Sequence, residues 1–160
     1  MSAQHVSLPS VPVFGPLLTR QLEWRPRFAA QVAAGDPASV VEIDRRGRLP
    51  QGDEPVDRVV ASLVLHRLDP SPKAAALAEA HEVLAPGGRI HIADWGMPRD
   101  PVEGVAFLGL RLLDGMTPTR QHATGALPAL LRGAGFTDVA VHDSFRTPFG
   151  RLELLSAVRG

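Results

Sequence analysis

The sequence predicts an α/β fold with a mostly parallel sheet of about five strands, an antiparallel last strand and helices on both sides. Two short apolar runs, residues 57–62 and 89–95, flank one amphipathic helix that ends at a Pro-Gly-Gly turn, residues 86–88. A strand–helix–strand unit joins two parallel neighbouring strands by a right-handed crossover. Because ligands bind beyond the carboxyl ends of such strands, the candidate site lies at residues 62–66 and 94–95.

An arm and a helix are expected in the N-terminal part, residues 1–39. Prolines make residues 1–16 irregular, whereas residues 17–34 have the apolar spacing of a helix. Pro26 is expected to break or kink this helix, since a proline in a helix interior lacks the N–H that the preceding turn needs. The apolar positions of the helix are Leu18, Leu22, Phe28 and Val32.

The predicted core of this single domain, 1–160, comprises residues 40–160. A β-branched run at residues 39–43 indicates a short strand, and the polar segment that follows, residues 44–55, indicates a loop. The central helix is expected to begin at Ser71-Pro72, because serine caps helices and proline suits their first position.

The last third of the chain predicts two helices and two strands. Apolar positions at helical spacing place helices over residues 102–113 and 120–132, with a loop at 114–119 between them. Apolar runs place strands over residues 139–142 and 152–158. The short connection between these strands predicts an antiparallel pair at the end of the sheet.

The composition excludes several classes of function. The 17 basic and 17 acidic residues give a formal net charge of zero, so no field attracts nucleic acid or an anionic membrane. The chain has no cysteine, which excludes disulfides, thiolate catalysis and cysteine zinc sites. Neither a signal peptide nor a membrane span is indicated, so we expect a soluble cytoplasmic protein.

His66 and Asp94 are the candidate catalytic residues. Both follow neighbouring strands, and the ordinary pKa of histidine, about 6.5, suits a general base. An aspartate beside a histidine can fix the tautomer of its ring, as in many acid–base sites. The alternative is architectural, with His66 holding the start of a loop and Asp94 capping a turn.

The segment after the second strand, residues 97–121, is expected to fold over these strand ends as a lid. Its apolar side chains either line a small-molecule pocket or belong to the core. The candidate substrate-binding residues are Ser62, Trp95, Phe107, Met116 and His122. The histidines lack the spacing of metal ligands, so no metal is predicted.

Several segments match one known family in order and spacing. They are Leu49-Pro50 with residues 56–60, the run 62–68 with its Leu65-His66, the turn at 82–89 and the helix at 130–136. Together these segments, over residues 40–158, resemble the class I S-adenosylmethionine-dependent methyltransferases of the small-molecule type 11 group. The resemblance implies a Rossmann-like methyltransferase fold, S-adenosylmethionine as cofactor and a small-molecule substrate.

The chain lacks the loop with which this family binds its cofactor. The family's first strand ends in a glycine-rich loop, G-x-G-x-G, and no such loop precedes residue 57. The simplest interpretation is a truncated fold in which residues 40–43 pair beside residues 59–61. Three functions remain open: a methyltransferase-fold protein with a degenerate cofactor site, a cofactor-independent enzyme of biosynthesis that transfers protons, and a non-catalytic partner of a complete methyltransferase. The uncovered sheet edge predicts a homodimer.

Overall fold

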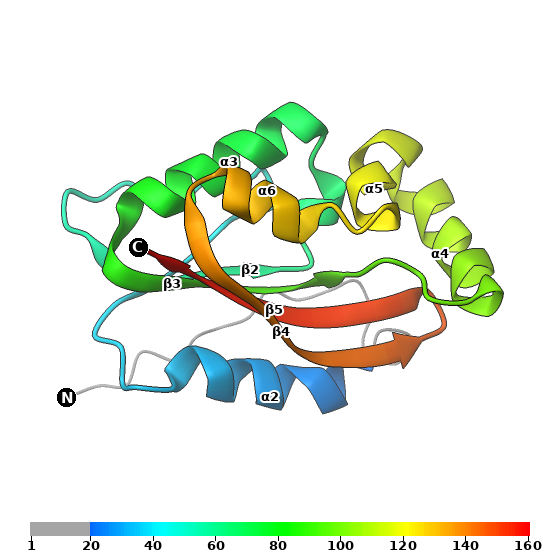
Figure 1. Cartoon of the computed structure of the whole chain (residues 1–160), viewed down its shortest axis with the longest axis horizontal. Helices are drawn as coiled ribbons and strands as arrows, with labels where there is room; N and C mark the ends of the chain where they lie inside the picture. The colour runs from blue at the N-terminus through cyan, green and yellow to red at the C-terminus, as the bar shows by residue number, and fades with distance from the viewer. Residues whose placement is uncertain (1–19) are drawn as a thin grey trace.

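The protein has the predicted α/β architecture in its computed structural model, which describes residues 20–160 (Figure 1). The expected arm and Leu18 lie outside the described residues. In chain order the elements are α2 (Gln21–Ala33), β1 (Val40–Glu42), β2 (Val56–Ser62), the 3₁₀ turn η1 (Leu65–Arg67), α3 (Pro70–Val83), β3 (Leu84–Trp95), α4 (Pro101–Asp114), α5 (Met116–Ala123), α6 (Leu127–Gly133), β4 (Phe136–Thr147) and β5 (Gly150–Arg159).

The described strands form one five-stranded sheet in the order β1-β2-β3-β5-β4. β1 pairs in parallel with β2, where Val41 lies opposite Val59, and β2 pairs in parallel with β3. β5 runs antiparallel to both β3 and β4, so it alone points in the opposite direction within this sheet. The mostly parallel sheet, the antiparallel last strand and the place of β1 beside β2 are therefore confirmed.

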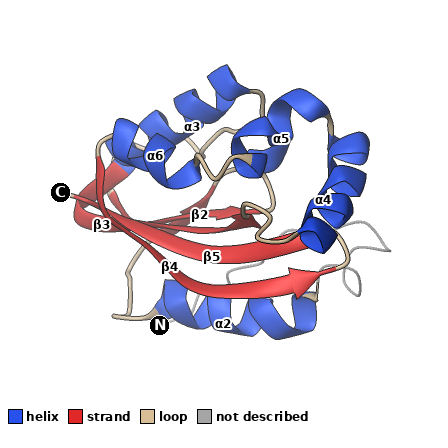
Figure 2. Cartoon of the chain, turned by 45° about the vertical axis from the view of Figure 1, so that its right-hand side comes forward, coloured by secondary structure: helices blue, strands red, loops and turns tan. Residues whose placement is uncertain are grey.

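Helices cover both faces of the sheet, with α3, α5 and α6 on one side and α2 on the other (Figures 1 and 2). Two clusters of buried side chains follow this division. The first includes Leu77 of α3, Ile90 of β3 and Leu131 of α6. The second includes Phe28 of α2 and Phe107 of α4. These layers place α5 against η1, which follows the carboxyl end of β2, and α4 against β5.

A loop of residues 43–55, without a helix, connects the parallel strands β1 and β2. Side chains at the start of the two strands hold them together. The Oδ2 atom of Asp57 accepts hydrogen bonds from the N–H groups of Ala38 at 2.7 Å and Ser39 at 3.2 Å. The Oγ atom of Ser39 accepts one from the N–H of Asp57 at 2.9 Å. β1 is thus an edge strand, and the homodimer at this edge stays a prediction.

The helix α2 continues through Pro26, so the predicted break is wrong. Trp24, Phe28 and Val32 recur every four residues and are all buried against the sheet. An interior proline costs a helix about 3 kcal/mol, whereas burying each large apolar side chain contributes roughly 1.5–3 kcal/mol. Packing therefore outweighs the missing hydrogen bond. Leu22, which we expected on the apolar face, is exposed.

The segment expected as a loop and one helix forms two short helices instead. α5 begins at Met116 and includes Pro118 in its first turn, where a missing N–H costs little. Gly125, with φ of +68°, separates α5 from α6 because the left-handed backbone interrupts the helix. Pro128 then lies in the first turn of α6, which explains why this proline is tolerated.

Candidate functional site

Asp94 joins the carboxyl ends of β2 and β3. Its carboxylate is fully buried and accepts three backbone hydrogen bonds. Oδ2 accepts from the N–H of Leu65 at 2.9 Å and of His66 at 3.3 Å, and Oδ1 accepts from the N–H of Trp95 at 2.8 Å. The carboxylate therefore fixes the start of η1 against the end of β3. The sharp bend before η1 is made by Leu63, whose φ is +52°.

The predicted pairing of His66 with Asp94 is present in the structure. Nδ1 of His66 lies 2.7 Å from Oδ1 of Asp94, and the ring is 2% exposed. Its other nitrogen, Nε2, lies 3.2 Å from Oδ2 of Asp114, the last residue of α4. A carboxylate accepts hydrogen bonds, so a ring held between two carboxylates donates from both nitrogens as an imidazolium.

The charges of this group stabilise one another. Burial lowers the pKa of His66, but the charges and hydrogen bonds of Asp94 and Asp114 outweigh it and raise that pKa above its ordinary value. Burial raises the pKa of Asp94, yet His66, His122 and the hydrogen bonds bring it below its ordinary value. His66 therefore has no free nitrogen for a substrate proton. This geometry favours the architectural alternative, and the catalytic role of the pair stays a prediction.

Two further buried groups surround His66. Nδ1 of His122 in α5 lies 2.7 Å from the carbonyl oxygen of Trp95, which makes Nδ1 the protonated nitrogen. Burial lowers the pKa of His122 to about 4, so this ring is neutral at pH 7. Lys73 of α3 is buried and donates to the carbonyl oxygen of Pro118 at 2.8 Å. The contact with Trp95 attaches α5 to the end of β3, and the contact with Lys73 attaches it to α3.

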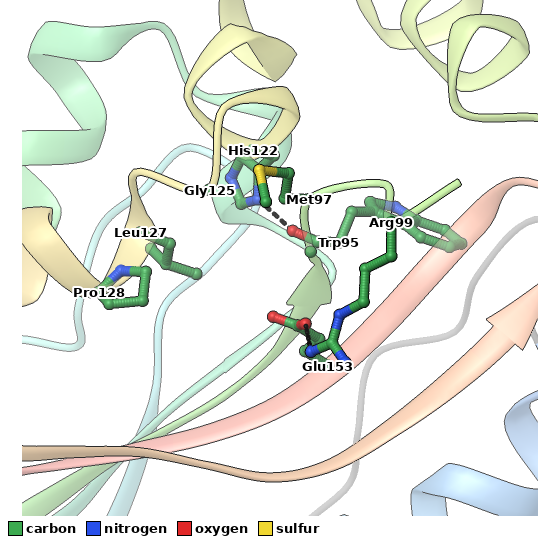
Figure 3. A pocket seen from close by; sticks show the side chains of 9 residues that line it. Trp95, Met97, Arg99, His122, Gly125, Leu127, Pro128 and Glu153 are labelled. Atoms are coloured by element: carbon green, nitrogen blue, oxygen red, sulfur yellow. Dashed lines mark hydrogen bonds and ion pairs between the residues drawn. The ribbon is translucent and has the colours of Figure 1, made fainter. Parts of the chain in front are cut away.

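A small hollow lies beside this buried group, at the end of β3 (Figure 3). Its volume is about 170 Å³. An apolar cavity of about 150 Å³ holds benzene, so the hollow is large enough for about one ring. It is lined by Trp95, Gly96, Met97, Arg99, His122, Gly125, Leu127, Pro128 and Glu153. The ion pair of Arg99 and Glu153, 3.5 Å apart, lies at its polar side.

The structure brings only part of the predicted substrate-binding set together. Trp95 and His122 line the hollow. Ser62 is buried at the end of β2, and Phe107 is buried in the cluster next to α2. Met116 is 48% exposed at the start of α5. None of these last three residues lines the hollow, and their role in binding a substrate stays a prediction.

Sequence reasoning missed Asp114, Arg99 and Glu153. Asp114 is 48 residues from His66, and Glu153 is 54 residues from Arg99. No spacing rule connects residues so far apart. One signal was available for Glu153: β5 is antiparallel to β3, and this pairing places Glu153 opposite Asp94.

The end of β1 carries a compact turn. The Oδ1 atom of Asp44 accepts hydrogen bonds from the N–H groups of Arg46 at 2.8 Å and Arg48 at 2.9 Å. The N–H of Asp44 donates to the carbonyl oxygen of Arg48, and the N–H of Gly47 donates to that of Asp44. The backbone groups of this turn therefore bond to one another. Nearby, burial raises the pKa of Glu42 to about 7, against a lowering by Arg25.

Neither a metal-binding cluster nor a membrane-spanning helix is present among residues 20–160. No group of three or more His, Asp or Glu side chains in this part of the chain is arranged to hold an ion. No helix in the same range is long and apolar enough to cross a membrane.

Comparison with known proteins shows similarity to methyltransferases. Residues 22–92 match the sequence model of a family described as methyltransferase domain, and no curated protein sequence matches the chain. An O-methyltransferase family protein from Burkholderia thailandensis is 22% identical, with a TM-score of 0.52, and the match covers 74% of this chain and 33% of that one. A SAM-dependent methyltransferase from Thermotoga maritima is 19% identical, with a TM-score of 0.53, and the match covers 72% of this chain and 61% of that one. Human N-acetylserotonin methyltransferase, in complex with SAM, is 21% identical, with a TM-score of 0.51, and the match covers 73% of this chain and 32% of that one.

These matches define the chain as a Rossmann-like α/β protein with a methyltransferase fold. The matched family model and this fold agree with the resemblance to the class I S-adenosylmethionine-dependent methyltransferases. The chain spans about a third of the length of the Burkholderia and human proteins. Their activities, cofactors and substrates are therefore not transferred to this chain by the match.

Proposed function

We propose that this protein is a methyltransferase-fold domain with a degenerate S-adenosylmethionine site that binds a small molecule in the hollow beside Trp95. The turn at the end of β1 carries this proposal. A glycine-rich loop leaves backbone N–H groups free and lets a cofactor approach the backbone closely. Here Asp44 accepts the N–H groups of Arg46 and Arg48, so these donors are already used.

The single glycine of this turn, Gly47, does not let a cofactor come close to the backbone either. Gly47 has φ of +77°, and a Cβ atom placed on it would lie 2.8 Å from a side-chain atom of Leu68. The glycine thus serves the contact between the turn and the residues before α3. The chain at the end of β1 does not fit the family's mode of binding S-adenosylmethionine, and we route no methyl-transfer step through that cofactor.

The hollow supplies the features of a small-molecule site. Apolar side chains such as Met97, Leu127 and Pro128 meet the ion pair of Arg99 and Glu153. Sites for small ligands usually combine apolar walls with a few polar groups that set orientation. Burial raises the pKa of Glu153, against the lowering effect of Arg99. We expect a ligand of about one ring, with a polar substituent that reaches Arg99 or Glu153.

Titration calorimetry with S-adenosylmethionine and S-adenosylhomocysteine tests the cofactor half of the proposal. We expect no saturable binding by either compound at concentrations up to about 1 mM, where an interaction is worth only about 4 kcal/mol. A complete methyltransferase measured in parallel is the control, because it shows that both compounds are able to bind under the conditions used. A dissociation constant in the micromolar range for either compound would contradict the degenerate site.

Ligand-detected NMR with a set of one-ring compounds tests the hollow. Met97→Trp should fill the space and abolish binding, because Met97 lines it and is half exposed. Val141→Trp is the matched control, since Val141 is equally exposed on β4, away from the hollow. Binding that survives in Met97→Trp, or is lost in both variants, would rule out this hollow as the ligand site.

The filled space above His66 favours one alternative, a non-catalytic partner of a complete methyltransferase. Ser62, His66 and Asp94 are all buried beneath α4 and α5, so the strand ends carry no open acceptor site at these residues. Such a partner would raise the activity of a complete methyltransferase without binding S-adenosylmethionine itself. No comparable observation favours a cofactor-independent proton-transfer enzyme, because both nitrogens of His66 already bond to carboxylates.

A further inference from the structure

The helix α4 is apolar on two opposite sides. One side holds Glu103, Phe107 and Leu110, which are buried against the sheet. The other side carries an exposed set of large apolar residues at helical spacing. They are Val102, Val105, Leu108, Leu112 and Leu113, with Met116 following in α5. A helix that is apolar all round is normally covered on all sides, so the outward side of α4 lacks a cover within residues 20–160.

The exposed side of α4 also lacks charge. The charged residues of the helix, Glu103, Arg111 and Asp114, all have partners elsewhere in the chain. Arg111 bonds to Thr119, and Asp114 bonds to His66. An uncharged apolar face is complementary to a second copy of itself, because no like charges meet across the contact.

Gly109 lies in the middle of this face. A Cβ atom placed on Gly109 would meet no atom of residues 20–160 within 4 Å, so the packing of these residues does not require glycine there. Glycine destabilises a helix interior relative to alanine. A partner helix that crosses closely at Gly109 supplies the missing reason, since only glycine lets two helix backbones approach that far.

We propose that α4 pairs with α4 of a second copy of this chain, antiparallel, across a two-fold axis near Gly109. In an antiparallel pair, positions equally far from the axis on opposite ends meet. Val105, four residues before Gly109, then contacts the partner's Leu113, four residues after it. The opposed helix dipoles also favour this direction.

The size of the face fits a dimer. Val105, Leu112 and Leu113 are 74%, 73% and 74% exposed. At roughly 100 Å² per fully exposed aliphatic side chain, the whole set presents roughly 400 Å² per copy, or about 800 Å² for a pair. Apolar atoms make up about 60% of an interface, so the total area is roughly 1,300 Å², at the lower end of stable complexes.

Pairing through α4 is independent of what the hollow binds, and it differs from the dimer at the β1 edge that the sequence predicted. Sedimentation of the full chain should show twice the monomer mass of 17.1 kDa at high concentration. Leu112→Glu should weaken the dimer by at least about tenfold, because it places a charge in the apolar contact. A monomer at all concentrations, or a dimer that Leu112→Glu leaves unchanged, would overturn the proposal.

A pair of glycine variants separates helix stability from pairing. Gly109→Ala and Gly104→Ala both fill open space in α4 and should both stabilise the monomer. Gly109→Ala alone should weaken the dimer, because its methyl group lies between the two helices. Equal effects of the two variants on dimerisation would contradict a crossing at Gly109.

Cysteine pairs test the direction of the helices, since the chain has no cysteine of its own. Val105→Cys and Leu113→Cys are prepared as separate variants, mixed and oxidised. The antiparallel arrangement predicts more mixed disulfide than either homodimeric disulfide. Predominance of the two homodimeric disulfides indicates parallel helices and overturns the proposed geometry.

Discussion

Asp94→Asn is the most informative change in the buried group at the strand ends. The substitution keeps the shape of the side chain but removes its charge and replaces one acceptor oxygen by an NH₂ donor. Three backbone N–H groups and Nδ1 of His66 now meet one acceptor oxygen instead of two. His66 also loses one of its two carboxylate partners while it remains buried.

The expected cost is large because it leaves a charge without its partner in the interior. Removing one member of a buried ion pair typically costs about 3–5 kcal/mol. For a domain of this size, about 2–4 °C of melting temperature is lost per kcal/mol, so the midpoint should fall by roughly 10 °C or more. Asp114→Asn is the matched control. The Asp114 side chain is 19% exposed, and losing one hydrogen bond there should cost about 1–2 kcal/mol.

Urea unfolding at several pH values measures both variants. The pKa of His66 is raised in the folded state. The stability that it contributes is therefore complete below the unfolded pKa, about 6.5, and is lost as the pH rises through the folded pKa. Asp94→Asn should flatten this loss. A change below about 1 kcal/mol in Asp94→Asn, or an equal loss in both variants, would refute the view that Asp94 organises the strand ends.

Two more substitutions test the fold and its ionisation. Pro26→Ala should stabilise the protein by roughly 1–3 kcal/mol, because it restores a hydrogen bond inside α2. The control is Pro118→Ala, which should change the stability little because Pro118 lies in the first turn of α5. Equal effects of the two variants in urea unfolding would contradict this reasoning. Burial raises the pKa of Glu42 in the folded state to about 7, so the wild type loses stability as the pH rises from about 4.3, the unfolded pKa, through 7. Glu42→Gln removes this ionisation. The substitution should therefore stabilise the protein by about 1–2 kcal/mol at pH 8 and by much less at pH 5. Exposed Glu54→Gln is its control, and a gain that does not depend on pH would contradict the assignment.

The order of secondary structure was largely readable from local signals. Apolar runs marked β2, β3 and β5. The Pro-Gly-Gly sequence, residues 86–88, lies inside β3, where the register with β2 shifts. Gly135, with φ of +98°, follows the end of α6, where a left-handed backbone favours glycine. These signals are local because backbone preference and side-chain period act over a few residues.

Prolines were the main source of error. Pro26 was expected to interrupt α2, and Pro118 was expected in a loop. Whether a proline ends a helix depends on its position relative to the first turn and on the packing of its neighbours. Neither quantity follows from the residue alone, since both depend on where the helix begins and what it contacts.

The sequence by itself determined the class of fold, the parallel unit of β2 and β3, the resemblance to methyltransferases and the approach of His66 to Asp94. These follow from local patterns and from the rule that parallel strands bring their carboxyl ends to one edge. Only the tertiary structure decided that Asp114 takes the second nitrogen of His66, that Arg99 and Glu153 flank a hollow, and that α4 keeps an apolar face outward. The physical reason is distance along the chain. Contacts between residues some 50 positions apart depend on how whole helices pack, and no local pattern contains that information.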